Sequence, residues 1–342
     1  MQQFLAFAAA AAALTLFTPS AGADQQAEPA RIEAGADTVL AGEWLWPEGE
    51  AEALIVLVTG NGPHSRDQVI SGSPMFGQLA RGLAGEGVAS LRVDEAGVGE
   101  STGAVTADFR ERLPHVAAMV DAAAIEAEAR GIPLILLGHS EGAMIAPLVA
   151  ADRPVVDGLV LLAPPVLPGR QVWIDQQVSM TRQGLPDLTE TDYVNVELAL
   201  NAVVDAVEVR DMDAIEAGVT AWFDAAGLLE VLRADGTLDG AIARMQSAEM
   251  HTFLTYDPRP ALAAIERPVL AIFGEIDANV SPDMNRAPLE AIAGPAWRIE
   301  VMPDADHFFM RAEGAAPGEH VFGEMVLDPA LAALIAESLP VE

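Results

Sequence analysis

A serine at the apex of a glycine-flanked pentapeptide, Gly138-His139-Ser140-Glu141-Gly142, is the strongest chemical signal in the chain. An apolar run over residues 132–137 precedes it, and residues 143–150 follow it with helical character. A Gly-x-Ser-x-Gly turn between a strand and a helix strains the serine backbone and exposes the hydroxyl. The two glycines suit such a turn because a side chain at either position would collide with the neighbouring strand or helix. The pattern therefore predicts a nucleophilic serine.

A serine hydroxyl needs a histidine to accept its proton and a carboxylate to orient that histidine. After a turn of this kind the partners follow the serine in the order acid, then histidine. His307 comes directly after a predicted strand and is the predicted base. Asp277 follows another buried strand and is the predicted acid, in competition with Glu275 and Asp283. We favour Asp277, because Glu275 lies very close to the strand end and Asp283 belongs to a predicted helix N-terminus.

The tetrahedral intermediate of acyl transfer also needs N–H donors for its oxyanion. The backbone N–H of Glu141, at the start of the helix, is one predicted donor. The other is expected from the Gly-rich loop at residues 59–63, where the N–H of Asn61 is the best candidate and Pro63 has no N–H. His64 of the same loop is expected to line the site, whereas the side chain of His139 is expected to turn into the structure.

The clearest of the elements that must hold these residues are short, continuous apolar runs such as residues 54–58, which are typical of strands buried on both faces of a parallel sheet. Predicted strands cover residues 38–47, 54–58, 88–93, 132–137, 158–163, 268–273 and 297–301. Helical patterns lie between or after them at residues 75–85, 108–130, 143–150, 284–293 and 329–338. This alternation predicts an α/β fold with a mainly parallel sheet flanked by helices. The polar residues 24–36 are expected to form a mobile lead-in.

One region interrupts the alternation. Residues 166–255 contain no convincing strand, and their apolar positions recur at helical spacing. We interpret them as a helical cap or lid inserted between two core segments, residues 24–165 and 256–342. The insertion begins after the strand at 158–163, at the sheet edge where active sites of open α/β sheets lie. Its apolar inner face is therefore expected to shape a substrate pocket.

Composition limits the classes of partner. The chain has 342 residues, 51% of them hydrophobic, so it can bury a large core as one large domain or two smaller ones. Its net charge of −33 disfavours nucleic acid and anionic membranes as partners, because both carry negative phosphate. The acidity suits a solvated surface or a saline habitat. The absence of cysteine excludes disulfides and thiolate catalysis, and no metal-ligand spacing occurs, so no metal and no cofactor is expected.

The N-terminus has the pattern of a secretory signal peptide. Residues 4–17 are almost entirely apolar and too short to span a bilayer comfortably. Thr18-Pro19-Ser20 ends this run, and the small residues at 21–23 suit a cleavage site after Ala23. We therefore expect residues 1–23 to be removed from an exported, periplasmic or secreted protein that keeps no membrane span. Because the first three residues include no Lys or Arg, an uncleaved N-terminal anchor is the alternative.

Three segments, at residues 59–67, 91–103 and 138–142, resemble the α/β-hydrolase superfamily of serine hydrolases. Within it they are similar to a bacterial subgroup labelled carboxylesterases, acyl hydrolases or prolyl-oligopeptidase-like hydrolases. The resemblance covers residues 38 to 340. Its Asp-x-Arg-Gly-x-Gly-x-Ser turn has Ala96 here in place of the arginine, a departure that concerns local packing more than catalysis.

The resemblance implies a cofactor-independent hydrolase that forms an acyl-serine intermediate on small-molecule esters. The residues it assigns are the triad Ser140, Asp277 and His307 and the backbone oxyanion donors Asn61 and Glu141. A small Gly-rich approach and an apolar cap favour short to medium acyl chains. Thioesters and amides are alternative substrates for the same residues, and a non-catalytic binding protein of this fold is the further alternative. No pattern in the chain defines an oligomeric state.

Overall fold

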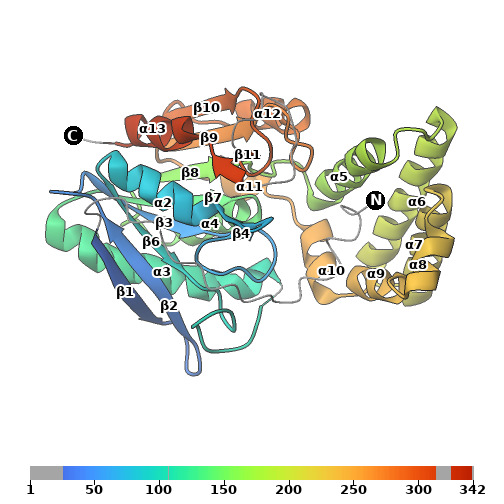
Figure 1. Ribbon diagram of the computed structural model, residues 1–342, viewed down its shortest axis with the longest axis horizontal. Coiled ribbons are helices and arrows are strands. Elements are labelled where there is room, and N and C mark those ends of the chain that lie inside the picture. Colours follow the sequence, from blue (N-terminus) through green and yellow to red (C-terminus); the bar gives the residue numbers. More distant parts are fainter. Residues whose placement is uncertain (1–25, 107, 313–324, 341–342) are drawn as a thin grey trace. The chain divides into compact units, whose positions relative to one another are not determined.

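The computed structural model describes residues 26–106, 108–312 and 325–340 (Figure 1). These residues form two compact units. One is an α/β unit built from the chain up to residue 167 and again from residue 258, and the other is a helical unit of residues 168–257. The helical unit corresponds by position to the insertion expected at residues 166–255. The predicted signal peptide, residues 1–23, lies outside the described residues.

An eight-stranded sheet forms the centre of the α/β unit. In spatial order its strands are β1 (Gln26–Glu33), β2 (Val39–Trp46), β6 (Val88–Val93), β3 (Ala53–Val58), β7 (Leu134–His139), β8 (Gly158–Leu162), β9 (Val269–Gly274) and β10 (Trp297–Met302). Neighbouring strands in the stretch β6-β3-β7-β8-β9-β10 pair in parallel, while β2 runs antiparallel to both β1 and β6. Every residue of β3, β6, β7, β8 and β9 is buried, as their continuous apolar runs predict. The predicted mainly parallel α/β fold is thus confirmed.

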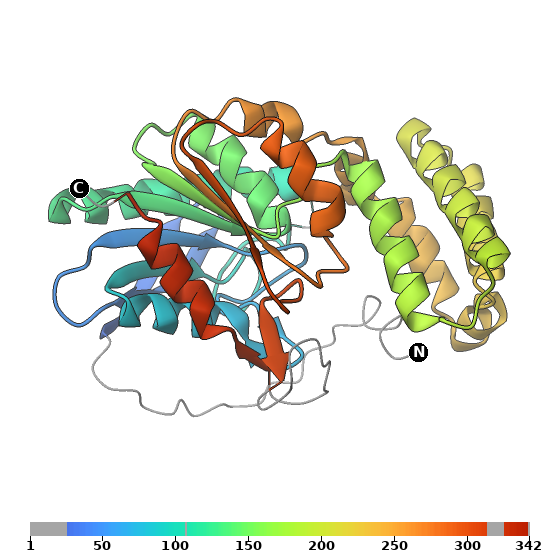
Figure 2. The ribbon, with the colours of Figure 1, turned by 90° about the horizontal axis from the view of Figure 1, so that it is seen from above.

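Helices cover both faces of this sheet. Helices α2 (Met75–Gly85) and α13 (Pro329–Glu337) pack together on one face, and α3 (Phe109–Arg130) and α4 (Glu141–Ala151) pack together on the other (Figure 2). Two shorter helices, α11 (Arg259–Ala263) and α12 (Pro282–Glu290), flank β9 in the chain. Small antiparallel pairs complete the unit: β4 (Val69–Ile70) with β5 (Ser73–Pro74), and β11 (Met310–Ala312) with β12 (Met325–Leu327).

The expectation of a mobile lead-in at residues 24–36 is wrong. Residues 26–33 form β1, which pairs with β2 along its whole length, from Gln26 opposite Trp46 to Glu33 opposite Val39. Ala30 and Ile32 are buried while their neighbours are exposed, the period of two that a half-buried strand requires. Only these two residues of the strand are buried, so its apolar signal was too short to register in the sequence.

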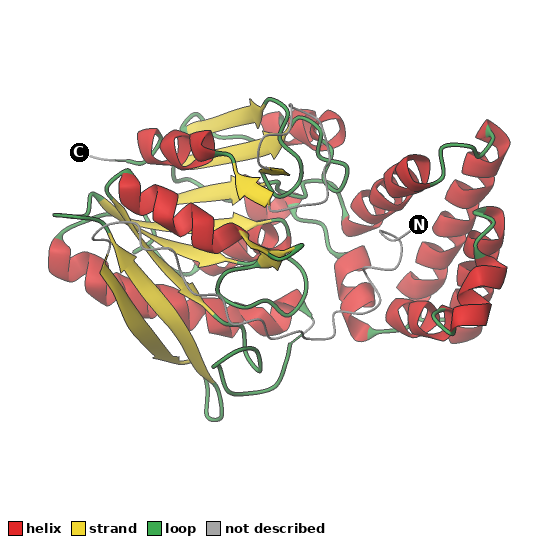
Figure 3. Ribbon diagram, in the orientation of Figure 1, coloured by secondary structure: helices red, strands yellow, loops and turns green. Residues whose placement is uncertain are grey.

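The helical unit has an apolar core of its own. Its helices are α5 (Gly169–Gly184), α6 (Glu190–Val209), α7 (Met212–Ala225), α8 (Leu229–Asp235), α9 (Leu238–Met245) and α10 (Ala248–Thr255), and Figure 3 shows no strand in this part. Trp222 is central to the core, with its ring 5.7 Å from Trp173 and 4.3 Å from Phe223. Such aromatic packing gives a short segment enough buried area to hold together. In the described residues, no helix combines the length and apolar character needed to cross a membrane.

Candidate active site

Ser140 lies at the predicted turn between β7 and α4. Its backbone has φ 55° and ψ −116°, a conformation that non-glycine residues rarely adopt. A Cβ on Gly138 would lie 2.1 Å from the carbonyl oxygen of Gly142, and one on Gly142 would lie 2.3 Å from that of Val58. No side chain fits at either glycine. The Ser140 N–H donates to the carbonyl of Leu162 at 2.8 Å, which anchors the turn to β8.

The structure brings Ser140, His307 and Asp277 into one hydrogen-bonded chain. Nε2 of His307 lies 3.1 Å from Oγ of Ser140, and Nδ1 of His307 lies 2.8 Å from Oδ2 of Asp277. The other carboxylate oxygen of Asp277 accepts the N–H groups of Asn279 at 2.7 Å and Val280 at 2.8 Å. With Nδ1–H donating to the carboxylate, Nε2 is left to accept the proton of the serine. This arrangement can activate a hydroxyl as a nucleophile.

The loops after β9 and β10 carry Asp277 and His307, and they are tied together. A Cβ on Gly274, the last residue of β9, would lie 2.4 Å from the carbonyl oxygen of Asp306, so glycine lets the histidine loop pack directly on the strand end. The N–H of Ile276 donates to the carbonyl of Ala305 at 3.0 Å. Asp277 and His307 are thus positioned by two adjacent parallel strands.

The two competing carboxylates have other partners. Glu275 accepts the N–H of Asp304 at 3.0 Å through Oε2. Asp283 lies in the first turn of α12, where negative charge is favourable. Asp306, next to His307 in the sequence, accepts the N–H groups of Phe308 and Met310 and shapes the turn. The carboxylate hydrogen-bonded to the His307 ring is that of Asp277, at 2.8 Å.

Burial and charge define the protonation pattern of the site. Asp277 is 3% exposed and His307 is 7% exposed. Burial opposes the charged form of Asp277, but the charge and hydrogen bond of His307, with the two backbone N–H groups, hold the pKa of the carboxyl below its ordinary value. Burial and then the neighbouring His307 lower the pKa of His139 to about 3. Neutral His139 therefore supports the His307 loop, donating from Nε2 to the carbonyl of His307 at 2.9 Å.

The loop after β3, which carries the predicted donor Asn61, passes close to Ser140. A Cβ on Gly60 would lie 3.5 Å from Cβ of Ser140, so the backbone passes close to the hydroxyl-bearing residue. The Gly60 N–H donates to Oε1 of Gln68 at 2.9 Å. The Asn61 side chain donates from Nδ2 to Oε2 of Glu141 at 2.9 Å, which joins the residues of the two predicted donors. His64 donates from Nε2 to the Asn61 carbonyl at 2.8 Å. Burial lowers the pKa of His64, although this hydrogen bond acts in the opposite direction.

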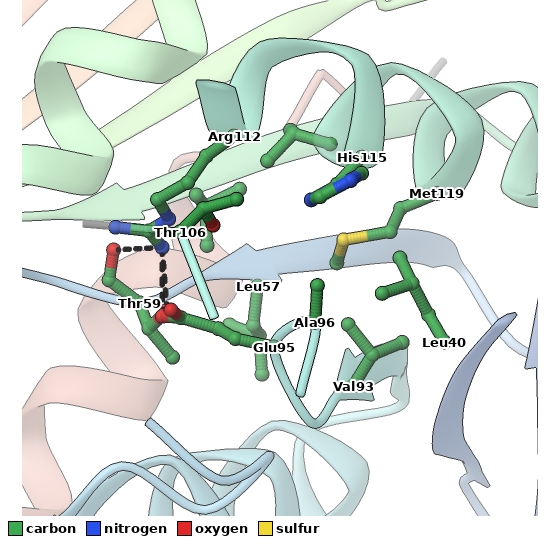
Figure 4. Close-up of a pocket in the computed structure, with 12 residues that line it drawn as sticks. Leu40, Leu57, Thr59, Val93, Glu95, Ala96, Thr106, Arg112, His115 and Met119 are labelled. Atoms are coloured by element: carbon green, nitrogen blue, oxygen red, sulfur yellow. Dashed lines mark hydrogen bonds and ion pairs between the residues drawn. The ribbon is translucent and has the colours of Figure 1, made fainter. Parts of the chain in front are cut away.

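Two residues that the sequence reasoning missed hold this loop. Gln68, 1% exposed, bridges the Gly60 N–H to Nδ1 of His139 through its amide group. Arg112 of α3, 4% exposed, donates from Nη1 to the Gly60 carbonyl of the same loop at 2.8 Å, and its guanidinium lies next to Thr59 (Figure 4). Phe109, Arg112 and Val116 recur at helical spacing on the buried face of α3. An arginine among apolar residues of a buried helix face was the signal in the sequence that could have identified Arg112.

The departure at Ala96 lies in a small pocket that Arg112 also lines. Ala96 is 2% exposed and lines the same small pocket as the Arg112 side chain (Figure 4). The preceding Asp94 is held by Arg66, with Nε to Oδ1 at 3.1 Å and Nη2 to Oδ2 at 2.7 Å. Burial opposes the charge on Asp94, but Arg66 keeps the pKa of this carboxyl below its ordinary value. Guanidinium groups from outside the turn thus contact acidic residues next to the Ala96 position.

The described residues contain no group of three or more His, Asp or Glu side chains placed to hold a metal ion. The chemistry that this geometry offers is proton transfer along serine, histidine and carboxylate next to a strained backbone turn.

Comparisons with known proteins agree with this geometry. Residues 49–313 match the family described as serine aminopeptidase, S33. The chain is 26% identical over 286 residues to the esterase EstD of Thermotoga maritima, covering 82% of this chain and 61% of that protein. It is 38% identical over 128 residues to the human monoglyceride lipase, covering 35% of this chain and 38% of that protein. The chain thus spans less than two thirds of the length of either relative.

A solved esterase of Pyrococcus furiosus has the same fold, with a TM-score of 0.56 at 14% identity over 92% of this chain and 90% of that one. Together with the family match and the EstD relative, this shared fold confirms the predicted resemblance to the α/β-hydrolase superfamily. Since the family match extends over more than half of its length, the chain belongs to the serine aminopeptidase, S33 family of α/β hydrolases.

Proposed function

We propose that this protein hydrolyses carboxylic esters through an acyl-serine intermediate. The observation that carries the proposal is the hydrogen-bonded chain from Oγ of Ser140 through the His307 ring to Asp277, on a strained turn. The names of its relatives, an esterase and a monoglyceride lipase, support ester substrates.

In the proposed reaction, Oγ of Ser140 attacks the ester carbonyl carbon while its proton passes to Nε2 of His307. The tetrahedral intermediate collapses, the bond to the alcohol breaks, and His307 returns the proton to the departing alkoxide. Water then attacks the acyl group with His307 again as base, and release of the acid regenerates Ser140. Asp277 holds the His307 tautomer and stabilises the imidazolium that forms twice in each cycle.

We propose the backbone N–H groups of Asn61 and Glu141 as donors to the oxyanion of both tetrahedral intermediates. Support comes from the closeness of the Gly60 backbone to Ser140 and from the side-chain hydrogen bond between Asn61 and Glu141. The Gly60 N–H is already bonded to Gln68, which favours the next N–H along the loop.

For substrate choice we propose short to medium acyl chains, which the close passage of the Gly60 backbone beside Ser140 supports. The helical unit is inserted in the chain between β8 and β9, two neighbouring strands of the sheet. The family description favours one further candidate, cleavage of an N-terminal amide bond, since the same residues can attack either carbonyl.

A fluorophosphonate probe tests the nucleophile, and p-nitrophenyl esters of rising chain length test the substrate class, beside aminoacyl anilides for the amide candidate. We expect labelling and ester turnover by the wild type and loss of both in S140A. S338A, at the end of α13, is the matched control and keeps both. D277N lowers kcat about 10³- to 10⁴-fold by disturbing the His307 tautomer, whereas E275Q does not. Labelling of S140A, or full activity of D277N, would contradict the assignment.

A further inference from the structure

Arg112 makes an unusually complete set of contacts for a buried arginine. Its Nη1 donates to the carbonyl of Gly60 at 2.8 Å and to Oε1 of Glu141 at 2.9 Å. Its Nη2 donates to the carbonyl of Thr59 at 3.0 Å and lies 2.9 Å from Oε1 of Glu95. Figure 4 shows the guanidinium next to Thr59 and Glu95, with dashed lines to both. A planar fork is needed to reach all of these groups, and the single ammonium of lysine cannot reproduce it.

The contact with Gly60 controls the direction of a predicted oxyanion donor. The Gly60 carbonyl and the Asn61 N–H belong to one peptide group, which is planar and trans, so the two bonds point in opposite directions. The described residues contain no cis peptide bond. By holding the Gly60 oxygen at 2.8 Å, Arg112 turns the Asn61 N–H to the other side of the peptide. A charged donor on the carbonyl also polarises the peptide and strengthens its N–H as a donor.

The second predicted donor is tied to the same guanidinium. Glu141 is 4% exposed, and its carboxylate accepts from Arg112 through Oε1 and from the Asn61 side chain through Oε2, both at 2.9 Å. Glu141 opens α4 immediately after Ser140. One buried cation therefore connects the loop after β3 with the start of the helix that follows the serine.

We propose that Arg112 is a positioning residue that aims the N–H groups of Asn61 and Glu141 at the oxyanion of the tetrahedral intermediate. The inference rests on the proposed function, because it requires Ser140 to be the nucleophile. Without the Arg112 fork the Gly60–Asn61 peptide can rotate, and the tetrahedral intermediate then loses the Asn61 N–H as a hydrogen-bond donor. The neutral substrate depends much less on this donor than the charged intermediate does. Loss of Arg112 should therefore act on kcat and on binding of oxyanion mimics, with little effect on KM.

The decisive variant is R112K, because it keeps a positive charge between the carboxylates of Glu95 and Glu141. R112M removes that charge as well and leaves two buried carboxylates without it. Arg130, near the end of the same helix, is exposed and forms an ion pair with Glu126, so R130K and R130M are the matched controls. N61A removes the Asn61–Glu141 link and keeps the Asn61 N–H, and since Asn61 is exposed this change does not threaten folding.

The measurements are kcat and KM for a p-nitrophenyl ester, the inhibition constant of a trifluoromethyl ketone, and the melting temperature. Ser140 adds to the ketone carbon and its proton passes to His307, which leaves an anionic hemiketal oxygen in place of the oxyanion. We expect R112K to lower kcat about 10- to 100-fold and to weaken the inhibitor by a similar factor, with KM within about twofold. N61A should move kcat and inhibitor binding in the same direction by a smaller factor, and the Arg130 variants should move neither.

The outcomes separate this inference from the proposed function. A wild type that neither turns over esters nor labels at Ser140 overturns the proposed function, and the inference with it. An active, labelled wild type with folded R112K and N61A that keep kcat and inhibitor binding within about twofold overturns the positioning role alone. In that case a lowered melting temperature of R112K would assign Arg112 to folding stability only. If R112M does not fold, R112K and N61A still decide the question.

Discussion

Replacing Glu95 by glutamine should change how the stability of this protein depends on pH. Glu95 is 9% exposed, and its Oε1 accepts the Thr59 hydroxyl and faces Arg112. Its Oε2 has no hydrogen-bond partner within the described residues. Burial, only partly offset by the charge of Arg112, raises the pKa of this carboxyl from 4.5 to about 7. At pH values between 4.5 and about 7, Glu95 of the folded protein therefore holds a proton that Glu95 of the unfolded chain releases.

The sign follows from that difference. A raised pKa means that the stabilising contribution of Glu95 is complete below pH 4.5 and is lost as the pH rises to about 7. The difference between the folded and unfolded pKa values corresponds to about 3 kcal/mol of stability at 1.36 kcal/mol per pH unit. Of this stability, about 2 to 3 kcal/mol is lost between pH 5 and pH 8. The glutamine side chain in E95Q resembles the protonated carboxyl in shape and does not titrate. The unfolding free energy of the wild type should therefore fall by this amount more than that of E95Q over the same interval.

Urea unfolding followed by tryptophan fluorescence at pH 5 and pH 8 measures both free energies. Groups other than Glu95 titrate in both proteins, so the difference between the two pH dependences isolates this carboxyl. E48Q, in the exposed turn after β2, is the control and should follow the wild type at both pH values. A free-energy difference between wild type and E95Q that is equal at pH 5 and pH 8 would refute the raised pKa and the charge balance argued around Arg112.

Two further predictions concern the turn and the N-terminus. G142A should lower the melting temperature by several degrees or prevent folding, since its Cβ would lie 2.3 Å from the Val58 carbonyl oxygen. G240A is the control, because the added Cβ meets open space there. Equal melting temperatures for the two variants would contradict the packing argument. We also propose export with cleavage after Ala23, so that mass spectrometry of the protein recovered from a secreting host finds Asp24 as the first residue; an intact residue 1 on exported protein would instead favour the uncleaved anchor.

Much of the candidate site could be read from the sequence because its signals are local. Ser140 and Asp277 follow strands that show as apolar runs, β7 and β9, and His307 follows β10, in which apolar and charged residues alternate. These strands lie at one end of the sheet in the order β7-β8-β9-β10 and run parallel, so their carboxyl ends share an edge. Local pattern and the rules of parallel sheets therefore suffice to bring the three residues together.

Other features lacked such a signal. Strand β1 is held by pairing with β2 and buries only two of its residues, so its own sequence resembles a polar lead-in. Gln68 lies in a loop far along the chain from His139 and contacts it only because β3 and β7 are adjacent in the sheet. The spacing of Gln68 and His139 along the chain does not by itself predict this contact.

The sequence by itself determined the candidate nucleophile, Ser140, through a turn whose glycines and flanking strand and helix are all contiguous. Only the tertiary structure decided which buried polar groups support that turn. Arg112, Glu95 and Glu141 come from three separate elements, and their carboxylates and guanidinium are stable inside the protein only when paired. Pairing of buried charges is a property of three-dimensional proximity, and each of these side chains taken alone resembles a solvated surface residue.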